Sequence, residues 1–199
     1  MSKKILVTAF EPFGGLELNS SALVLEKLKQ KYKNIEVMKL QLPVLYKEAY
    51  DILEKTIEEL SPDVVICMGQ AGGRKKISIE RIAVNINNSL SKDNSGITKI
   101  DDTIKNNGPS AYFTNLPYKQ MLSASGNAVV MSYSAGTYIC NDIFYRLMDY
   151  IITDNPRIKG GFLHLPYTEH FGKMPYTVLE SQVSAVESML AVLGEINEK

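Results

Sequence analysis

The chain has 199 residues, of which 45% are hydrophobic and 22% are charged, and its 22 basic residues balance its 22 acidic ones. This composition suits one domain over residues 1–199 with a sizeable core. It offers no basic stripe for a nucleic acid or an anionic membrane, and no apolar run of about 20 residues for a membrane span. A neutral small molecule or a peptide fits better as a partner.

Short β-patterned runs alternate with longer helical patterns along the chain. This order predicts an α/β fold, a single-domain three-layer α/β/α sandwich with a mainly parallel central sheet. Apolar runs bounded by turn residues predict strands at 4–10, 35–42, 63–68, 77–86, 128–132 and 161–165. Apolar stripes at helical spacing predict helices from 19 or 20 to 31 and at 46–60, 117–125, 136–152 and 177–196. The polar segment 87–107 lacks periodicity and predicts a loop or hairpin.

The two cysteines indicate free thiols in a reducing cytosol, because an α/β protein of this size needs no disulfides. The first residues run directly into a strand and do not resemble a signal peptide, so we expect a cytoplasmic protein. The net charge of zero fits a chain that associates with itself. Two scattered histidines cannot supply a zinc site, and we expect neither a metal nor another cofactor.

Cys140 lies where a strand-like run gives way to a helical pattern, in the segment SAGTYICN at 134–141. Backbone N–H groups in the first turn of a helix favour the thiolate, which predicts a thiol pKa lowered from about 8.5 toward neutrality. Free cysteines are more often small core residues. That interpretation suits Cys67, in the middle of an apolar strand, and leaves Cys140 as the candidate nucleophile.

His164 lies in another apolar strand, where a histidine by itself is more typical of a hydrogen-bonded core residue. Glu80 lies in a third apolar strand, where a carboxylate is costly unless it has a partner. That partner is either His164 or one of the two arginines nearby, Arg74 and Arg81. With Cys140, the histidine and the carboxylate make a nucleophile, a base and a group that orients the base, which is the arrangement of covalent acyl transfer.

Phe10 and Phe13 flank a tight turn at the carboxyl end of the first strand. They are either core aromatics or walls of an apolar pocket, because open α/β sheets bind ligands at this edge. The Gly-rich segment 69–73 ends another strand there. It lacks the Gly-Lys-Ser/Thr ending of a P-loop, so phosphate binding is weakly supported.

Five blocks of sequence carry a resemblance that covers essentially the whole chain. They are TAFEPFGG at 8–15, GQAGGR at 69–74 followed by ERIA at 80–83, GPSAYF at 108–113, SAGTYICN at 134–141 and FLHLPY at 162–167. In this order they resemble the pyroglutamyl peptidases type I, or pyrrolidone carboxyl peptidases. The resemblance implies an open α/β/α sandwich, a cytoplasmic location and often a homotetramer. It also implies a cysteine exopeptidase that removes N-terminal pyroglutamyl (5-oxoprolyl) residues from peptides through an acyl-enzyme.

The family pattern places the nucleophile on Cys140, the base on His164 and the orienting carboxylate on Glu80. Pyroglutamate is a lactam without a charged amine, so we expect an apolar sleeve with a few amide hydrogen bonds. The residues expected to bind it are Phe10, Phe13, Asn19, Gln70 and Ile139.

Two positions depart from the family pattern. Leu90 stands where the family usually has an arginine, and Tyr133 where it usually has an asparagine. The loss of one electrostatic donor can cost about 10²-fold in turnover. A catalytically weakened or inactive homologue that binds pyroglutamyl-like ligands is therefore the alternative. Arg74 or Lys92 could replace the cation, and we expect Leu90→Arg to raise turnover.

Overall fold

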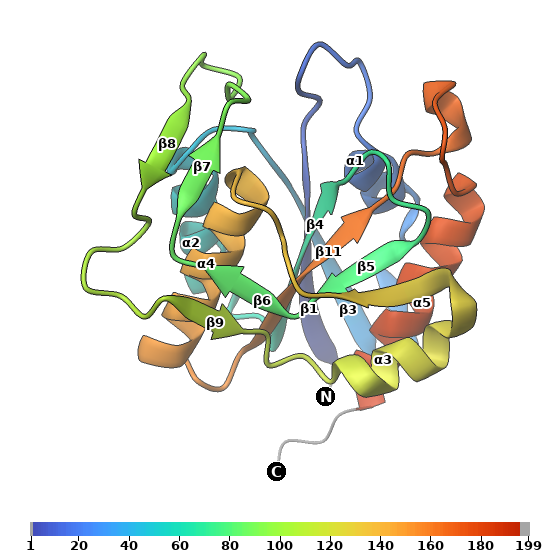
Figure 1. Ribbon diagram of the computed structural model, residues 1–199. Coiled ribbons are helices and arrows are strands. Elements are labelled where there is room, and N and C mark those ends of the chain that lie inside the picture. The colour runs from blue at the N-terminus through green and yellow to red at the C-terminus, as the bar shows by residue number, and fades with distance from the viewer. Residues whose placement is uncertain (1, 196–199) are drawn as a thin grey trace.

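A seven-stranded sheet forms the middle layer of the molecule, with helices on both faces (Figure 1). The structure is a computed structural model that describes residues 2–195. The strands of the sheet are β1 (Lys3–Phe10), β2 (Lys31–Tyr32), β3 (Ile35–Leu42), β4 (Val64–Gln70), β5 (Ile77–Glu80), β10 (Val129–Ser132) and β11 (Lys159–Leu165). They lie in the order β10-β5-β11-β4-β1-β3-β2.

The apolar residues of the helices form one core on each face of this sheet. The helices are α1 (Ser20–Lys27), α2 (Glu48–Leu60), α3 (Tyr118–Ser125), α4 (Ile139–Thr153) and α5 (Leu179–Glu195), with short 3₁₀ turns at Gly126–Ala128 and Glu169–Phe171. Buried side chains of α1, α3 and α5 share one core, and those of α2 and α4 share the other. The predicted three-layer α/β/α arrangement is therefore confirmed.

The sheet is mostly parallel, as predicted. Strands β1, β3, β4 and β11 run in the same direction, whereas β5 is antiparallel to β11 and parallel to β10. The carboxyl ends of β1, β4 and β11 consequently meet at one edge of the sheet. This is the edge where parallel α/β sheets bind their ligands.

The predicted strand at 77–86 is wrong as a single element. It divides at Arg81 into β5 and β6 (Ile82–Val84), and β6 pairs with β9 (Ala111–Phe113) in a separate two-stranded sheet. The guanidinium of Arg81 lies over two aromatic rings, and its backbone N–H donates to the carbonyl of Ser132. Continuous apolar alternation cannot reveal such a break, because both halves keep the strand pattern.

The segment 87–107 contains a hairpin, formed by β7 (Asn87–Ser89) and β8 (Lys99–Asp102). In Figure 1 it stands beside the start of α4. The backbone N–H of Asn88 donates to the carbonyl of Thr137 at 2.9 Å, and the Thr137 hydroxyl donates to the carbonyl of Asn88 at 2.6 Å. The hairpin is thereby joined to the segment that leads into α4.

Predicted helix ends differ from the structure by up to four residues. The first predicted helix extends to residue 31, whereas α1 ends at Lys27 because Leu28 adopts an extended backbone (ψ 143°). The predicted helix from 136 begins later, at Ile139, because Gly136 has a positive φ of 76°. The end predicted at residue 196 lies outside the described residues.

Candidate active site

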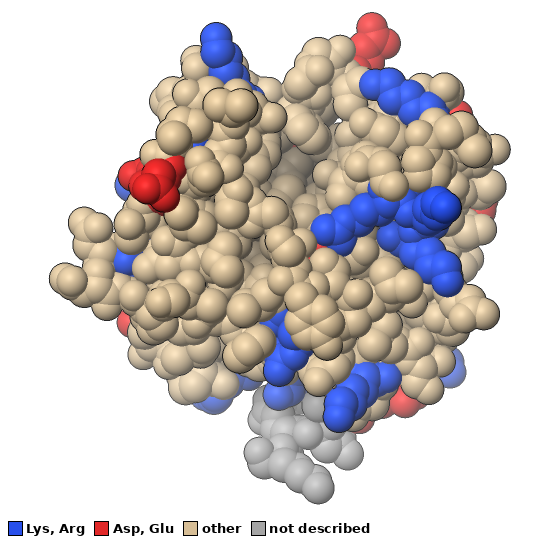
Figure 2. All heavy atoms as spheres, viewed as in Figure 1, with Lys and Arg blue, Asp and Glu red and all other residues tan. Residues whose placement is uncertain are grey.

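A cavity of about 200 Å³ opens where the carboxyl ends of β1, β4 and β11 meet the start of α4. Figure 2 shows the molecule hollowed between the β7–β8 hairpin and the loop that follows β1. Most of the side chains around the cavity are apolar. Its lining consists of Phe10, Phe13, Asn19, Val44, Gln70, Ala135, Tyr138, Ile139, Cys140 and His164. All five residues expected to bind the substrate are therefore in the lining, together with two members of the expected triad.

Cys140 is the second residue of α4 and is half-buried. The N–H of Asn141 donates to the carbonyl of Tyr138 at 2.9 Å, whereas the N–H groups of Ile139 and Cys140 precede the first hydrogen bond of the helix and can donate toward this side of the cavity. Burial nevertheless raises the pKa of the Cys140 thiol to about 12, and the negative charge of Glu80 acts in the same direction. The expected lowering of this pKa is wrong, because desolvation outweighs the opposing effects of Arg74 and the backbone N–H of Cys140. The resting thiol is neutral.

His164 and Glu80 form a buried pair behind the cavity wall. The Nδ1 atom of His164 lies 2.8 Å from Oε1 of Glu80, and the two side chains are 6% and 0% exposed. Burial lowers the pKa of His164, and together with the charge of Arg74 it outweighs the opposing hydrogen bond and charge of Glu80. The imidazole is therefore neutral at neutral pH. Its Nδ1–H is held by the carboxylate, which leaves Nε2 as the acceptor.

The partner of Glu80 was left open by the sequence, and the structure brings two partners to it. Nη1 of Arg74 lies 2.6 Å from the same Oε1 atom that His164 contacts. Arg81 instead donates to the backbone carbonyl of Thr114. Glu80 thus has both the histidine expected for a base and the ion pair expected for a structural carboxylate.

Cys67 is fully buried in β4, and burial raises the pKa of its thiol to about 12. It does not line the cavity. The core interpretation of Cys67 is confirmed.

Phe10 and Phe13 combine the two roles that the sequence left open. Phe10 is 3% exposed and belongs to the core beneath α2 and α4, yet it also faces the cavity. The ring of Phe13 lies 6.4 Å from that of Tyr138, and the ring of Tyr46 packs edge-on against Tyr138 at 5.7 Å. Phe13 and Tyr138 thus form an apolar wall of the cavity, and Tyr46 packs against Tyr138 outside the lining.

Asn19 and Gln70 are the polar members of the lining, and the chain already uses part of their hydrogen-bonding capacity. Asn19 caps α1 by accepting from the N–H of Ser21, and its amide donates to the carbonyl of Glu11 at 2.9 Å. Oε1 of Gln70 accepts from both the N–H and the hydroxyl of Ser20. The Nε2 group of Gln70 has no hydrogen-bond partner among residues 2–195 and is left to donate to a ligand.

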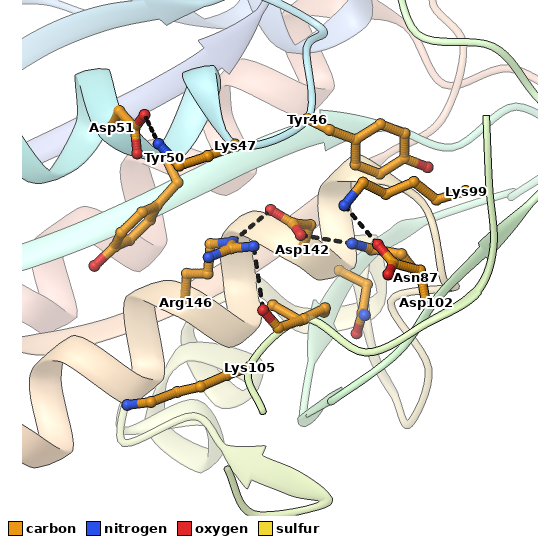
Figure 3. Close-up of polar contacts among 12 residues, drawn as sticks. Tyr46, Lys47, Tyr50, Asp51, Asn87, Lys99, Asp102, Lys105, Asp142 and Arg146 are labelled. Atoms are coloured by element: carbon orange, nitrogen blue, oxygen red, sulfur yellow. Dashed lines mark hydrogen bonds and ion pairs between the residues drawn. The ribbon is translucent and has the colours of Figure 1, made fainter. Parts of the chain in front are cut away.

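The residues after Cys140 tie the start of α4 to its surroundings. The amide of Asn141 accepts from the N–H of Val84 and donates to its carbonyl. The carboxylate of Asp142 lies between Asn87, at 2.7 Å, and Arg146, at 2.9 Å (Figure 3). Residues of β6 and β7, together with the next turn of α4, therefore hold the backbone that carries the cysteine.

Residues 3–193 match the pyroglutamyl peptidase family. The chain belongs to this family. The pyrrolidone-carboxylate peptidase of Brachyspira hyodysenteriae is 43% identical over 194 residues, which cover 94% of this chain and 96% of that protein. Pyrrolidone-carboxylate peptidase 1 of Caldanaerobacter subterraneus is 40% identical over 197 residues, covering 96% of this chain and 97% of the relative.

Solved structures of pyroglutamyl peptidases share this fold. The crystal structure of pyroglutamyl peptidase I from Bacillus amyloliquefaciens superposes with a TM-score of 0.92 at 36% identity and covers 99% of this chain and 97% of that one. The pyrrolidone carboxyl peptidase from Thermococcus litoralis gives a TM-score of 0.90 at 35% identity, with 96% and 92% covered.

The two departures from the pyroglutamyl peptidase pattern lie outside the cavity lining. The side chains of Leu90 and Tyr133 are 89% and 73% exposed. Leu90 directly follows β7 in the hairpin. The expectation that an arginine at position 90 would raise turnover has no support here, because water and salt screen a charge at so exposed a site.

Sequence reasoning missed three residues of this pyroglutamyl peptidase cavity, namely Val44, Ala135 and Tyr138. Val44 follows β3, which also ends at the carboxyl edge, so its place along the chain was a usable indication. Tyr138 stands directly before α4 and its hydroxyl donates to the carbonyl of Lys92 at 2.8 Å. Nothing in the sequence pairs those two residues.

Proposed function

We propose that this protein is a cysteine exopeptidase that removes N-terminal pyroglutamyl residues from peptides through an acyl-enzyme. The observation that carries this proposal is the placement of Cys140 and His164 in the lining of one small apolar cavity, with Glu80 hydrogen-bonded behind the histidine. Family membership over nearly the whole chain supports it.

The cavity suits a small uncharged ring. Phe10, Phe13 and Tyr138 supply apolar walls, and the Nε2 group of Gln70 supplies a donor for the lactam carbonyl. A peptide with an ordinary N-terminus carries a charged amine, and burying that charge among these rings is costly. Selectivity for the blocked N-terminus follows from this difference.

The chemistry starts from a neutral thiol and a neutral imidazole. As Sγ of Cys140 attacks the pyroglutamyl carbonyl carbon, Nε2 of His164 takes the thiol proton. Glu80 holds the ring through Nδ1–H and stabilises the imidazolium that forms. The N–H groups at the first turn of α4 receive the negative oxygen.

Collapse of the tetrahedral intermediate breaks the C–N bond, and His164 gives its proton to the departing amine. Water, deprotonated by His164, then attacks the thioester and releases pyroglutamate, and the proton returns to Cys140. Each proton that leaves the sulfur or the water passes through the same imidazole nitrogen.

Hydrolysis of two chromogenic amides tests this proposal. We expect purified protein to cleave pyroglutamyl p-nitroanilide but not prolyl p-nitroanilide, which has the same ring size and a charged amine in place of the lactam. A protein that binds pyroglutamate without releasing nitroaniline would instead fit the weakened homologue. That alternative is not favoured, because the histidine and the carboxylate are hydrogen-bonded in the arrangement that the chemistry requires.

A cytoplasmic location and a homotetramer are part of the same proposal. Both cysteines are free thiols, which supports a reducing compartment. In residues 2–195 no helix combines the length and apolarity that crossing a membrane requires. Large apolar side chains on the surface, including Phe113 and Met174 at 56% and 79% exposure, support self-association. Light scattering of the purified protein measures the assembly.

A further inference from the structure

The side chain of Arg74 contacts two parts of the candidate site at once. It lies in the loop between β4 and β5, and its Nη1 is 2.6 Å from Oε1 of Glu80. Its Nη2 donates to the backbone carbonyl of Ser134, in the segment that leads to α4, at 3.2 Å. The Arg74 side chain is 28% exposed whereas that of Glu80 is 0% exposed. Because its acidic member is fully desolvated, this ion pair is screened less than a surface pair.

Both partners of Glu80 bind the same oxygen. Oε1 receives Arg74 and also Nδ1 of His164, whereas Oε2 is buried without a hydrogen-bond partner in the described part of the chain. The guanidinium therefore acts on the very atom through which the carboxylate contacts the imidazole. In a buried setting such linked hydrogen bonds and charges influence one another strongly.

We propose that Arg74 is a positioning residue that fixes the Glu80 carboxylate and offsets part of its charge, so that His164 stays neutral in the resting enzyme. This inference rests on the proposed function, in which a neutral imidazole takes the proton of Cys140. A carboxylate without the arginine would favour the imidazolium, which cannot accept that proton. Arg74 does not line the cavity, so it acts through Glu80.

The charged and titratable groups that face His164 come from three elements. They are Glu80 on β5, Arg74 in the loop before β5 and Cys140 at the start of α4; β4 places only Gly69 opposite the histidine. Burial lowers the pKa of His164, Glu80 raises it and Arg74 lowers it. Arg74 also lowers the pKa of Cys140. Removing the arginine should therefore raise the pKa of the histidine.

The test compares Arg74→Met with Lys76→Met. Lys76 lies two residues further along the chain, has an exposed side chain and carries the same charge, so it is a matched control. The chain has two histidines, and NMR of the imidazole groups follows both. The side chain of His170 is 52% exposed and serves as the internal reference for His164. The acid limb of kcat/KM is measured on the same proteins.

We expect Arg74→Met to move the His164 titration and the acid limb of kcat/KM to higher pH, so that its deficit against wild type grows as the pH falls. A loss of kcat on the order of tenfold at neutral pH should accompany this shift, as for other groups that orient a histidine through a second residue. Arg74→Lys keeps the charge and should keep the limb near its wild-type position. If Arg74→Met does not fold, Arg74→Gln takes its place, and the same shift of the titration and of the acid limb is expected.

An unmoved His164 titration in folded Arg74→Met or Arg74→Gln would overturn the proposal, as would an equal shift in Lys76→Met. A loss of activity that does not vary with pH would also overturn it, because it would show that the ion pair between Arg74 and Glu80 is only structural. The titration needs no substrate. A wild-type protein that fails to cleave pyroglutamyl p-nitroanilide would therefore refute the proposed function while leaving this measurement intact.

Discussion

Gly69 provides a sharp test of how the site is packed. It lies in β4 directly opposite His164 of β11. A Cβ atom at this position would stand 2.8 Å from Sγ of Cys140 and 2.8 Å from Cζ of Phe162. Non-bonded contacts between such atoms are optimal at about 3.5–4.0 Å. Both neighbours must therefore retreat, by roughly 1 Å each, in Gly69→Ala.

The sulfur moves more easily than the ring, whose retreat carries the packing cost. Phe162 is fully buried, and its ring packs against those of Phe144 and His164 at 6.1 and 4.8 Å. Cys140 is only half-buried, and a single side-chain torsion swings its sulfur away. Displacing a reacting atom by about 1 Å can cost about 10²-fold in rate, and overpacking a core costs about 1–3 kcal/mol.

We expect Gly69→Ala to fold, to lose about 10²-fold in kcat and to melt a few degrees below wild type, on the order of 2–4 °C per kcal/mol. Turnover of pyroglutamyl p-nitroanilide and a thermal melt measure the two effects. Gly161→Ala is the matched control, because its Cβ would meet Leu116 and Thr114 at 2.5 Å rather than the thiol. It should lose stability and keep kcat. Wild-type kcat in folded Gly69→Ala would refute this account of the packing.

Three other predictions concern the same site. Cys140→Ala should abolish hydrolysis, whereas Cys67→Ala should keep turnover and lose about 1 kcal/mol of unfolding free energy, because it removes a buried sulfur from the core. An active Cys140→Ala protein would exclude the covalent route. The rate should fall as the pH drops, because His164 must be unprotonated to act. Burial lowers the pKa of His164 below its usual 6.5, so half-maximal kcat/KM is expected below pH 6.5. A midpoint above pH 6.5 would contradict the neutral resting imidazole. Leu90→Arg should leave kcat within about twofold of wild type, because a charge at this exposed position is screened. A tenfold gain in steady-state turnover would contradict this, since it would show that the side chain at position 90 reaches the cavity.

Strand and helix periodicity predicted much of the fold, because the buried faces of its elements carry regular apolar patterns. The strand at 35–42 agrees with β3 at both ends. The break at Arg81 could not be predicted, since the partners of Arg81 there, the rings of Phe113 and Tyr118, come from distant segments. The local apolar pattern predicts which residues are buried, but it does not predict which distant side chains stack on them.

The candidate site was predictable to a different degree at each residue. Cys140, His164 and Glu80 stand out in sequence because a thiol at a helix start, and polar groups in apolar strands, need a reason. The ionisation of Cys140 was mispredicted, because the helix-end argument counts the N–H groups and omits the desolvation that surrounds the sulfur. The sequence left Arg74 and Arg81 as alternative ion-pair partners of Glu80, and the choice between them depends on side-chain directions that sequence does not encode.

The protonated resting thiol has a consequence for the chemical durability of the protein. Peroxides, disulfides and alkylating reagents attack the thiolate, and a thiol with a pKa raised to about 12 presents very little thiolate at neutral pH. Formation of a sulfenic acid or a mixed disulfide at Cys140 is therefore slow while no peptide occupies the cavity. Its reactivity is conditional: the sulfur becomes nucleophilic when an acyl group lies against it and the imidazole can draw off its proton.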